Sequence, residues 1–168
     1  CVTDEGHLKN VIAFPSLSKR SNVPGLRSGF VVGDSDLIMD FARLRQYTGG
    51  ASPGPILAAA TSLWKDEAHV KANRALYREK FSDAEKIIGS HPHFYRPDGG
   101  FYLWLKVGDG EKTARRLWAS AGVKVLPGAY LSREGGNPPG RAYIRLALVH
   151  DRATTTEVLT RLATHIQE

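Results

Sequence analysis

Lys19 stands in a short segment whose residue types could bind an aldehyde cofactor and its phosphate. Ser16 and Ser18 precede it, and Arg27 follows eight residues later, across a stretch that contains proline and glycine. A lysine amine attacks a carbonyl only when it is unprotonated, which nearby positive charge or removal from water favours. The serine hydroxyls could donate hydrogen bonds to a phosphate, and the Arg27 guanidinium could bind it through two parallel hydrogen bonds. The segment therefore indicates carbonyl chemistry on an amine.

The same residue types also fit an ordinary surface loop. Serine, proline and glycine are common in exposed turns, and a lysine in such a turn is usually solvated. Residue types alone favour this reading, so the chemical interpretation of Lys19 depends on other segments of the chain.

Four segments, in the same order along the chain, resemble class I/II aminotransferases, which use pyridoxal 5'-phosphate. They are 16–30, 97–104, 125–130 and 143–148. Any one of them would be a weak signal, because glycine–aromatic patterns and arginines in strands are widespread. Together they extend over nearly the whole chain, which is therefore identified as similar to this family.

Within the family, the closest resemblance is to succinyldiaminopimelate transaminases of bacterial lysine biosynthesis. It rests on Ser-Leu-Ser-Lys-Arg-Ser-Asn at 16–22 and Trp-Lys-Asp-Glu-Ala-His-Val at 64–70. Aspartate-, alanine- and aromatic-type enzymes stay open as alternatives. The family's chains are more than twice as long as these 168 residues and place the lysine past their middle. We therefore expect a carboxy-terminal portion of the enzyme, which would be inactive alone because the other cofactor-binding groups precede the lysine.

The resemblance implies a cofactor role for four residues. Lys19 would join the cofactor covalently and then move a proton at the substrate α-carbon as general base and acid. Ser16, Ser18 and Arg27 would hold the cofactor phosphate.

Three further residues are candidates for the substrate side. Arg145 lies in an apolar segment, where an unpaired guanidinium would be costly to bury, so we expect an anionic partner. A place on the solvent side of an edge strand is the alternative that the pattern leaves open. By resemblance, Arg145 binds the substrate α-carboxylate and Gly100 lines the pocket, although a plain turn also explains Gly100. Asn22 or Arg20, on the cofactor-lysine loop, could reach a second acid group, and we take Asn22 as the candidate.

The order of apolar and polar segments, with the resemblance, predicts an α/β fold. It would comprise the end of a PLP-dependent transferase large domain, with a mixed, mostly parallel sheet, and a small carboxy-terminal α/β domain. Residues 1–64 would end the large domain, 65–90 would form a connecting helix with one apolar stripe, and 91–168 would form the small domain. The segment 56–64 is almost entirely apolar, so we expect a buried helix there.

Composition bears on partners and location. The 23 basic and 17 acidic residues give a net charge of +6, but the basic residues are dispersed, which favours a solvated surface over a nucleic-acid site. The single cysteine, Cys1, excludes an internal disulfide, and no apolar run is long enough to span a bilayer.

We therefore expect a cytoplasmic enzyme that acts on amino acids and 2-oxo acids. It would be a homodimer in its full-length form, with no nucleic-acid, membrane or metal partner. The remaining alternatives are an inactive scaffold fragment that serves as an interaction module, and a basic nucleic-acid binder.

Overall fold

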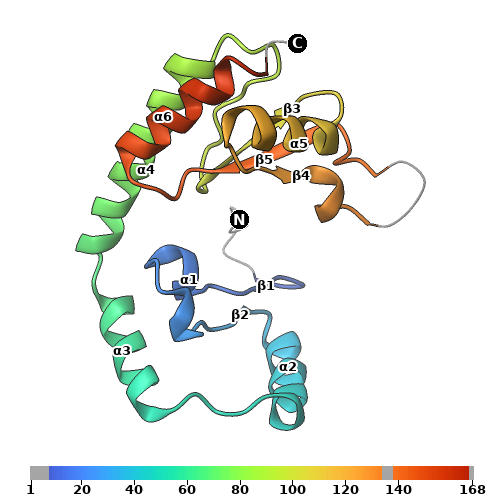
Figure 1. The fold of residues 1–168 in the computed structure, drawn as a ribbon. Helices are drawn as coiled ribbons and strands as arrows, with labels where there is room; N and C mark the ends of the chain where they lie inside the picture. The colour runs from blue at the N-terminus through green and yellow to red at the C-terminus, as the bar shows by residue number, and fades with distance from the viewer. Residues whose placement is uncertain (1–7, 134–137, 167–168) are drawn as a thin grey trace. The chain divides into compact units, whose positions relative to one another are not determined.

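The computed structural model describes residues 8–133 and 138–166, which form two compact units. The boundary between the units follows Asn73 and lies inside the long helix α4 (Ala68–Ile88). Figure 1 traces the elements of each unit in chain order. The assignment of the chain to a large domain, a connecting helix and a small domain stays a prediction.

The first unit contains two short strands and helices whose ends follow from local sequence. Asp34 caps one helix by accepting a hydrogen bond from the Asp36 N–H, and Gly49 ends that helix. Its elements are β1 (Ile12–Ala13), α1 (Leu17–Arg20), the 3-10 helix η1 (Pro24–Leu26), β2 (Val32–Gly33), α2 (Ser35–Thr48), α3 (Gly54–Lys65) and the start of α4.

The strands β1 and β2 pair in antiparallel fashion. The chain returns between them through α1 and η1, which are too short to form the helical crossover that parallel neighbours need. The mostly parallel sheet expected for this part of the chain is therefore not formed by these strands, although the α/β class is confirmed.

The helix α3 forms where an apolar helix was expected, but the expectation that it is buried is wrong. Ala60 is its one buried residue, and Leu57 keeps 52% of its surface exposed. Burial requires a covering element, and α1, which packs against α3 in this unit, has four residues. So short a helix covers little of α3.

The second unit, from Arg74 onward, is an antiparallel sheet of three strands with helices packed on one face (Figure 1). The strand order is β3-β5-β4, so β5 is the central strand. Asp109 and Asp151 cap the helices that follow the first and last strands. The elements after α4 are β3 (Tyr102–Lys106), α5 (Gly110–Ala121), β4 (Leu126–Pro127), the 3-10 helix η2 (Gly128–Leu131), β5 (Tyr143–Ala147) and α6 (Arg152–Ala163).

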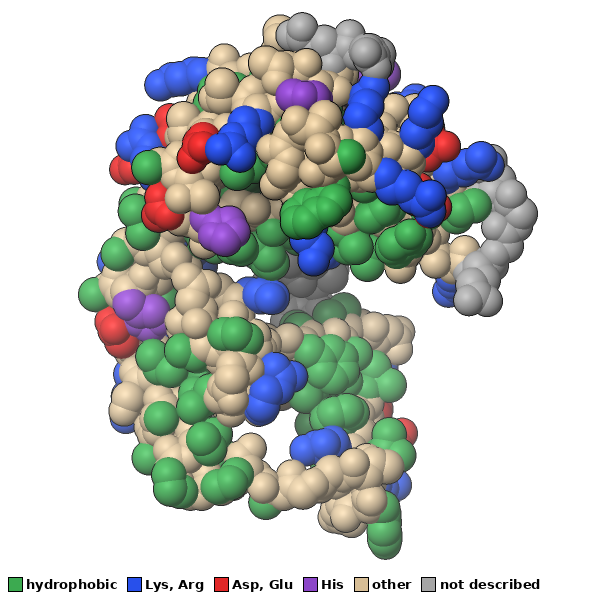
Figure 2. Space-filling model, in the orientation of Figure 1, with side chains coloured by type: hydrophobic (Ala, Val, Ile, Leu, Met, Phe, Trp, Pro, Cys, Tyr) green, Lys and Arg blue, Asp and Glu red, His purple; other side chains and the backbone are tan. Residues whose placement is uncertain are grey.

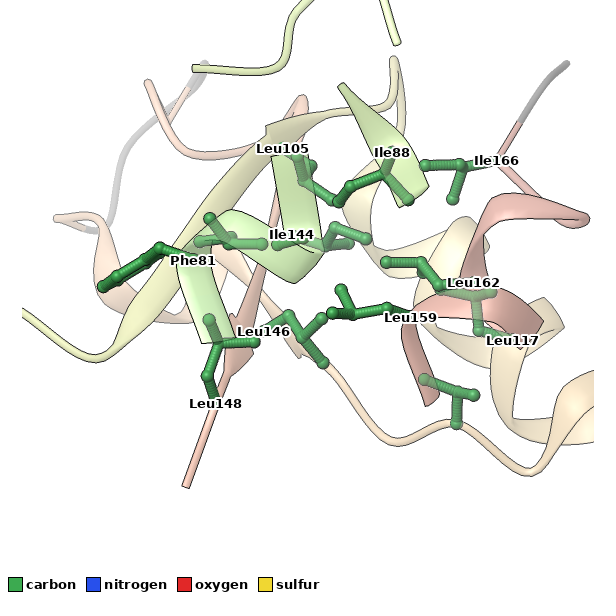
Figure 3. Packing of buried hydrophobic residues seen from close by; sticks show 13 residues of the cluster. Phe81, Ile88, Leu105, Leu117, Ile144, Leu146, Leu148, Leu159, Leu162 and Ile166 are labelled. Carbon is green, nitrogen blue, oxygen red and sulfur yellow. The ribbon is translucent and has the colours of Figure 1, made fainter. Parts of the chain in front are cut away.

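The core of this unit lies between the sheet and the helices α4, α5 and α6. Alternate residues of β3 and β5 point into it, as the period of a strand requires. Figure 3 shows Leu105 and Ile144 of the sheet close to Ile88 of α4, and Leu162 of α6 close to Leu117 of α5. The apolar stripe expected on α4 is confirmed. The buried cluster comprises Phe81, Ala84, Ile88, Leu103, Leu105, Leu117, Val123, Ile144, Leu146, Leu148, Leu159, Leu162 and Ile166.

Polar contacts tie the start of α6 to α4. Arg152 Nη2 donates to Asp83 at 2.9 Å, and Arg152 Nη1 pairs with Glu79 at 3.0 Å. The hydrogen bonds from Arg152 hold the pKa of the Asp83 carboxyl below its ordinary value. Lys80 donates to the backbone carbonyl of Leu148 at 3.0 Å, which satisfies a largely buried ammonium group.

Figure 2 shows how basic side chains are distributed on one face of the second unit. In the view of Figure 2 the lysines and arginines of the second unit lie among acidic and other polar side chains rather than in one patch. Among the residues that the structure describes, no helix is both long and apolar enough to cross a membrane.

Candidate active site

Lys19 lies on α1, a single helical turn with a fixed beginning. The Ser16 side chain caps this turn by accepting a hydrogen bond from the Ser18 N–H at 3.1 Å. Leu17, between the two serines, is completely buried and anchors the turn in the first unit. Lys19 itself is exposed, as is Ser16. The Lys19 side chain is therefore exposed on a turn whose backbone is fixed by the buried Leu17 and by the Ser16 cap.

A second stretch of backbone lies against this turn and depends on Gly29. The Leu17 N–H donates to the Ser28 carbonyl at 3.1 Å, and the Phe30 N–H donates to the Pro15 carbonyl at 3.0 Å. A Cβ atom at Gly29 would lie 2.6 Å from the Pro15 oxygen, closer than side-chain atoms approach in proteins. Only glycine fits here, and its absence of a side chain lets the two stretches pair.

Arg27 ends η1 in an uncommon backbone conformation. Its φ of 50° is left-handed, which a residue with a side chain adopts at a cost of about 1–2 kcal/mol. Its Nη1 atom donates to the Pro24 carbonyl at 2.9 Å. Within 8–133 and 138–166, no carboxylate forms an ion pair with this exposed guanidinium. Strained residues of this kind often occur at ligand sites, and the other N–H groups of Arg27 suit an anion.

The residues on this loop fit a phosphorylated aldehyde. Two serine hydroxyls and the Arg27 guanidinium are donors for a phosphate, and Lys19 supplies the amine that an aldehyde needs. Ser16 caps α1, Ser18 and Lys19 lie in α1, and Arg27 ends η1, so all four belong to the loop that the pairing of Ser16 with Gly29 closes. Ser16, Ser18 and Arg27 are therefore the residues that would hold the phosphate, and their roles remain predictions.

The two residues that we considered for a second substrate acid group are both engaged with the protein. Arg20 donates to a backbone carbonyl in the last turn of α3 at 2.8 Å, pairs with Glu67, and lies over the Trp64 ring at 4.9 Å. Asn22, with a left-handed φ of 54°, donates from Nδ2 to Asn73 Oδ1 at 2.9 Å. Arg20 is thus committed to α3, whereas Asn22 keeps its carbonyl oxygen and a second amide hydrogen.

A hydrogen-bonded chain that was not predicted from the sequence lies beside Lys19. His69 Nδ1 lies 2.7 Å from Asp66 Oδ2, and His69 Nε2 lies 2.9 Å from the Ser21 hydroxyl. The hydrogen bond from His69 lowers the pKa of Asp66. Asp66 lies just before α4 and His69 lies in its first turn, three residues later. This spacing is typical of side-chain pairs at a helix start, so the pair could have been found from sequence. Its contact with Ser21 could not.

In the second unit, Arg145 lies on the central strand β5, so the edge-strand alternative is wrong. Ile144 and Leu146 point into the core, and Arg145 lies on the opposite face, as alternation predicts. On that face its guanidinium is 5.3 Å from the centroid of the Tyr102 ring, and Trp104 is its neighbour on β3. The side chain is half-buried, and across the described part of the chain no carboxylate pairs with it. Such a guanidinium on an aromatic surface suits a carboxylate ligand.

Gly100 lies in the turn before β3 with a φ of 97°, a conformation that side chains disfavour. A Cβ atom there would meet nothing within 4 Å. The turn therefore requires glycine at Gly100 for its backbone angle and not for a close approach, and its role as a substrate residue stays a prediction. Among the described residues there is no cluster of three or more potential metal ligands.

Comparison with known proteins decides the family. The family described as aminotransferase class I and II matches residues 2–162. The chain belongs to that family. Its members depend on pyridoxal phosphate, the cofactor that the loop around Lys19 fits.

Individual proteins agree with this assignment. A crystal structure of an aminotransferase from Neisseria meningitidis is 44% identical, with a TM-score of 0.86, over 95% of this chain and 42% of that one. A probable aminotransferase of Mycobacterium tuberculosis is 30% identical over 86% of this chain and 34% of its own length. The LL-diaminopimelate aminotransferase of Syntrophobacter fumaroxidans is 30% identical over 90% and 39%. The chain thus spans roughly two fifths or less of these relatives.

Proposed function

We propose that the protein carrying this chain transfers an amino group between an amino acid and a 2-oxo acid with pyridoxal phosphate. The observation that carries the proposal is the loop around Lys19. An exposed lysine lies on a capped turn, and the loop that the pairing of Ser16 with Gly29 closes also carries Ser18 and the left-handed Arg27. The left-handed conformation of Arg27 costs about 1–2 kcal/mol, and residues in such conformations cluster at ligand sites.

Each residue then has a defined task. When bound, pyridoxal phosphate stabilises negative charge at the substrate α-carbon, which the protein alone cannot do. Ser16 and Ser18 donate their hydroxyl hydrogens to the phosphate, and Arg27 binds it with parallel N–H groups. Lys19 supplies the amine. It would also accept the proton from the substrate α-carbon and return it to the cofactor, as general base and then general acid. Arg145 binds the substrate carboxylate through two hydrogen bonds and so fixes the orientation of the α-carbon.

For the substrate we propose succinyldiaminopimelate, in lysine biosynthesis. The two segments that resemble the corresponding transaminases, 16–22 and 64–70, contact each other through Arg20 with Glu67 and Ser21 with His69. Relatives that include LL-diaminopimelate aminotransferases support a substrate of related skeleton. A cytoplasmic location and a homodimeric state are part of the same proposal.

Two experiments test this function. Pyridoxal phosphate added to the full-length protein that carries this chain should produce an absorbance band near the visible edge that Lys19→Ala abolishes. The kcat/KM for succinyldiaminopimelate should then exceed the values for aspartate, alanine and aromatic amino acids. A band that persists in Lys19→Ala contradicts the cofactor assignment. Cofactor binding without amino-group transfer from any of these donors would favour the inactive-scaffold alternative. A higher kcat/KM for aspartate than for succinyldiaminopimelate would favour an aspartate-type enzyme.

A further inference from the structure

Three consecutive residues that follow Lys19 are each held by one polar side chain from the end of the α3–α4 connection or the start of α4. The pairs are Arg20 with Glu67, Ser21 with His69, and Asn22 with Asn73. All six residues belong to the first unit. A one-to-one match between two short segments, 20–22 and 67–73, fixes the register of one against the other.

In the pair formed by Ser21 and His69, the contact of His69 with Asp66 sets the direction of the hydrogen bond. The Asp66 carboxylate accepts from His69 Nδ1, so in the neutral ring the proton is on Nδ1 and Nε2 accepts the hydrogen of the Ser21 hydroxyl. The Ser21 N–H in turn donates to the Leu17 carbonyl at 3.0 Å and closes the single turn of α1. His69 therefore acts on the residue that terminates the lysine helix.

A helix of one turn cannot hold its own shape, because nucleation costs more than one or two hydrogen bonds return. The position of Lys19 is therefore set by contacts outside α1. On its amino-terminal side Leu17 is buried, and on its carboxy-terminal side the left-handed Asn22 is held by Asn73. Without these contacts, the carboxy-terminal side of the turn would have several conformations available.

We propose that Asp66, Glu67, His69 and Asn73 form a clamp that positions Lys19 for reaction with the cofactor aldehyde. This rests on the proposed function, and the clamp residues are positioning residues that need not touch the cofactor. The carboxylates are half or more exposed, with 50% of the Asp66 side chain and 59% of the Glu67 side chain accessible. Exposed contacts of this kind contribute little to global stability but can select one local conformation.

The clamp predicts that local order and cofactor binding change more than overall stability. His69→Ala and Ser21→Ala should each raise the apparent Kd for pyridoxal phosphate roughly 2- to 13-fold, the effect of one lost hydrogen bond. The double variant should be no weaker than either single, because both remove the same contact. His69→Gln should restore part of the affinity. Lys71→Ala, an exposed change on the same helix, is the matched control.

The experiment measures the Kd, the thermal midpoint and amide hydrogen exchange in the cofactor-free protein. We expect the Ser21 amide to exchange faster in His69→Ala than in Lys71→Ala, with nearly equal midpoints. Equal exchange in the two variants, or additive effects of His69→Ala and Ser21→Ala on Kd, would overturn the clamp. A wild-type protein that binds no cofactor would overturn the proposed function instead, and the exchange data would still decide whether the clamp orders α1.

Discussion

Replacement of Gly29 by alanine tests whether the paired backbone around Lys19 prepares the cofactor site. The new Cβ would lie 2.6 Å from the Pro15 oxygen, so the two stretches must separate. The hydrogen bonds from Leu17 to Ser28 and from Phe30 to Pro15 would be lost or lengthened. At roughly 0.5–1.5 kcal/mol each, they amount to about 1–3 kcal/mol.

This energy should appear as lost cofactor affinity. If binding must first restore the paired arrangement, the apparent Kd rises by the inverse of the fraction that is still paired. About 1.4 kcal/mol corresponds to a factor of ten, so Gly29→Ala should weaken binding of pyridoxal phosphate by roughly 5- to 150-fold.

The matched control is Gly25→Ala on the same loop, where an added Cβ atom meets nothing within 4 Å. Titration of each variant with pyridoxal phosphate, followed by absorbance, gives the Kd values, and circular dichroism checks that both variants are folded. Equal affinities for Gly29→Ala and wild type would refute the reasoning. So would a loss of the same size in Gly25→Ala.

Two more predictions concern the second unit. Arg145→Lys should raise KM for amino-acid substrates by roughly 10- to 100-fold, because lysine cannot form the paired hydrogen bonds to a carboxylate. The control is Arg141→Lys, an exposed residue just before β5, which should leave KM unchanged. Equal effects of the two substitutions on KM would show that Arg145 does not bind the substrate. Asp83→Asn should lower the free energy of unfolding above pH 3.8, the ordinary pKa of an aspartate, since Arg152 lowers the folded-state value. The difference in free energy of unfolding between wild type and Asp83→Asn should shrink as the pH falls through the lowered pKa. Urea unfolding from about pH 6 to pH 2 measures it, and a difference that stays constant over this range would contradict the prediction.

Much of the second unit could be predicted because its signals are local. Alternation along β5 places Arg145 opposite Ile144 and Leu146, and Asp151 before an apolar-periodic segment marks the start of a helix. What the sequence could not determine was that β5 is the central strand, since strand order depends on contacts between distant segments. That order removes the edge-strand explanation for Arg145.

The first unit was harder to predict for the same reason. The residue types around Lys19 indicate the chemistry, but the close approach at Gly29 and the partners of Arg20, Ser21 and Asn22 involve residues far along the chain. The exposure of α3 was missed because an apolar sequence indicates a tendency to be covered and does not say which element covers it.

The central claim is that the Lys19 amine reacts with pyridoxal phosphate, and chemical trapping tests it most directly. The full-length protein that carries this chain would be mixed with the cofactor, reduced with borohydride, digested and analysed by mass spectrometry. We expect one reduced pyridoxyl phosphate on the peptide that contains Lys19, and none in Lys19→Ala. Labelling of another lysine, such as Lys65 or Lys106, or no labelling in the wild-type protein would contradict the account.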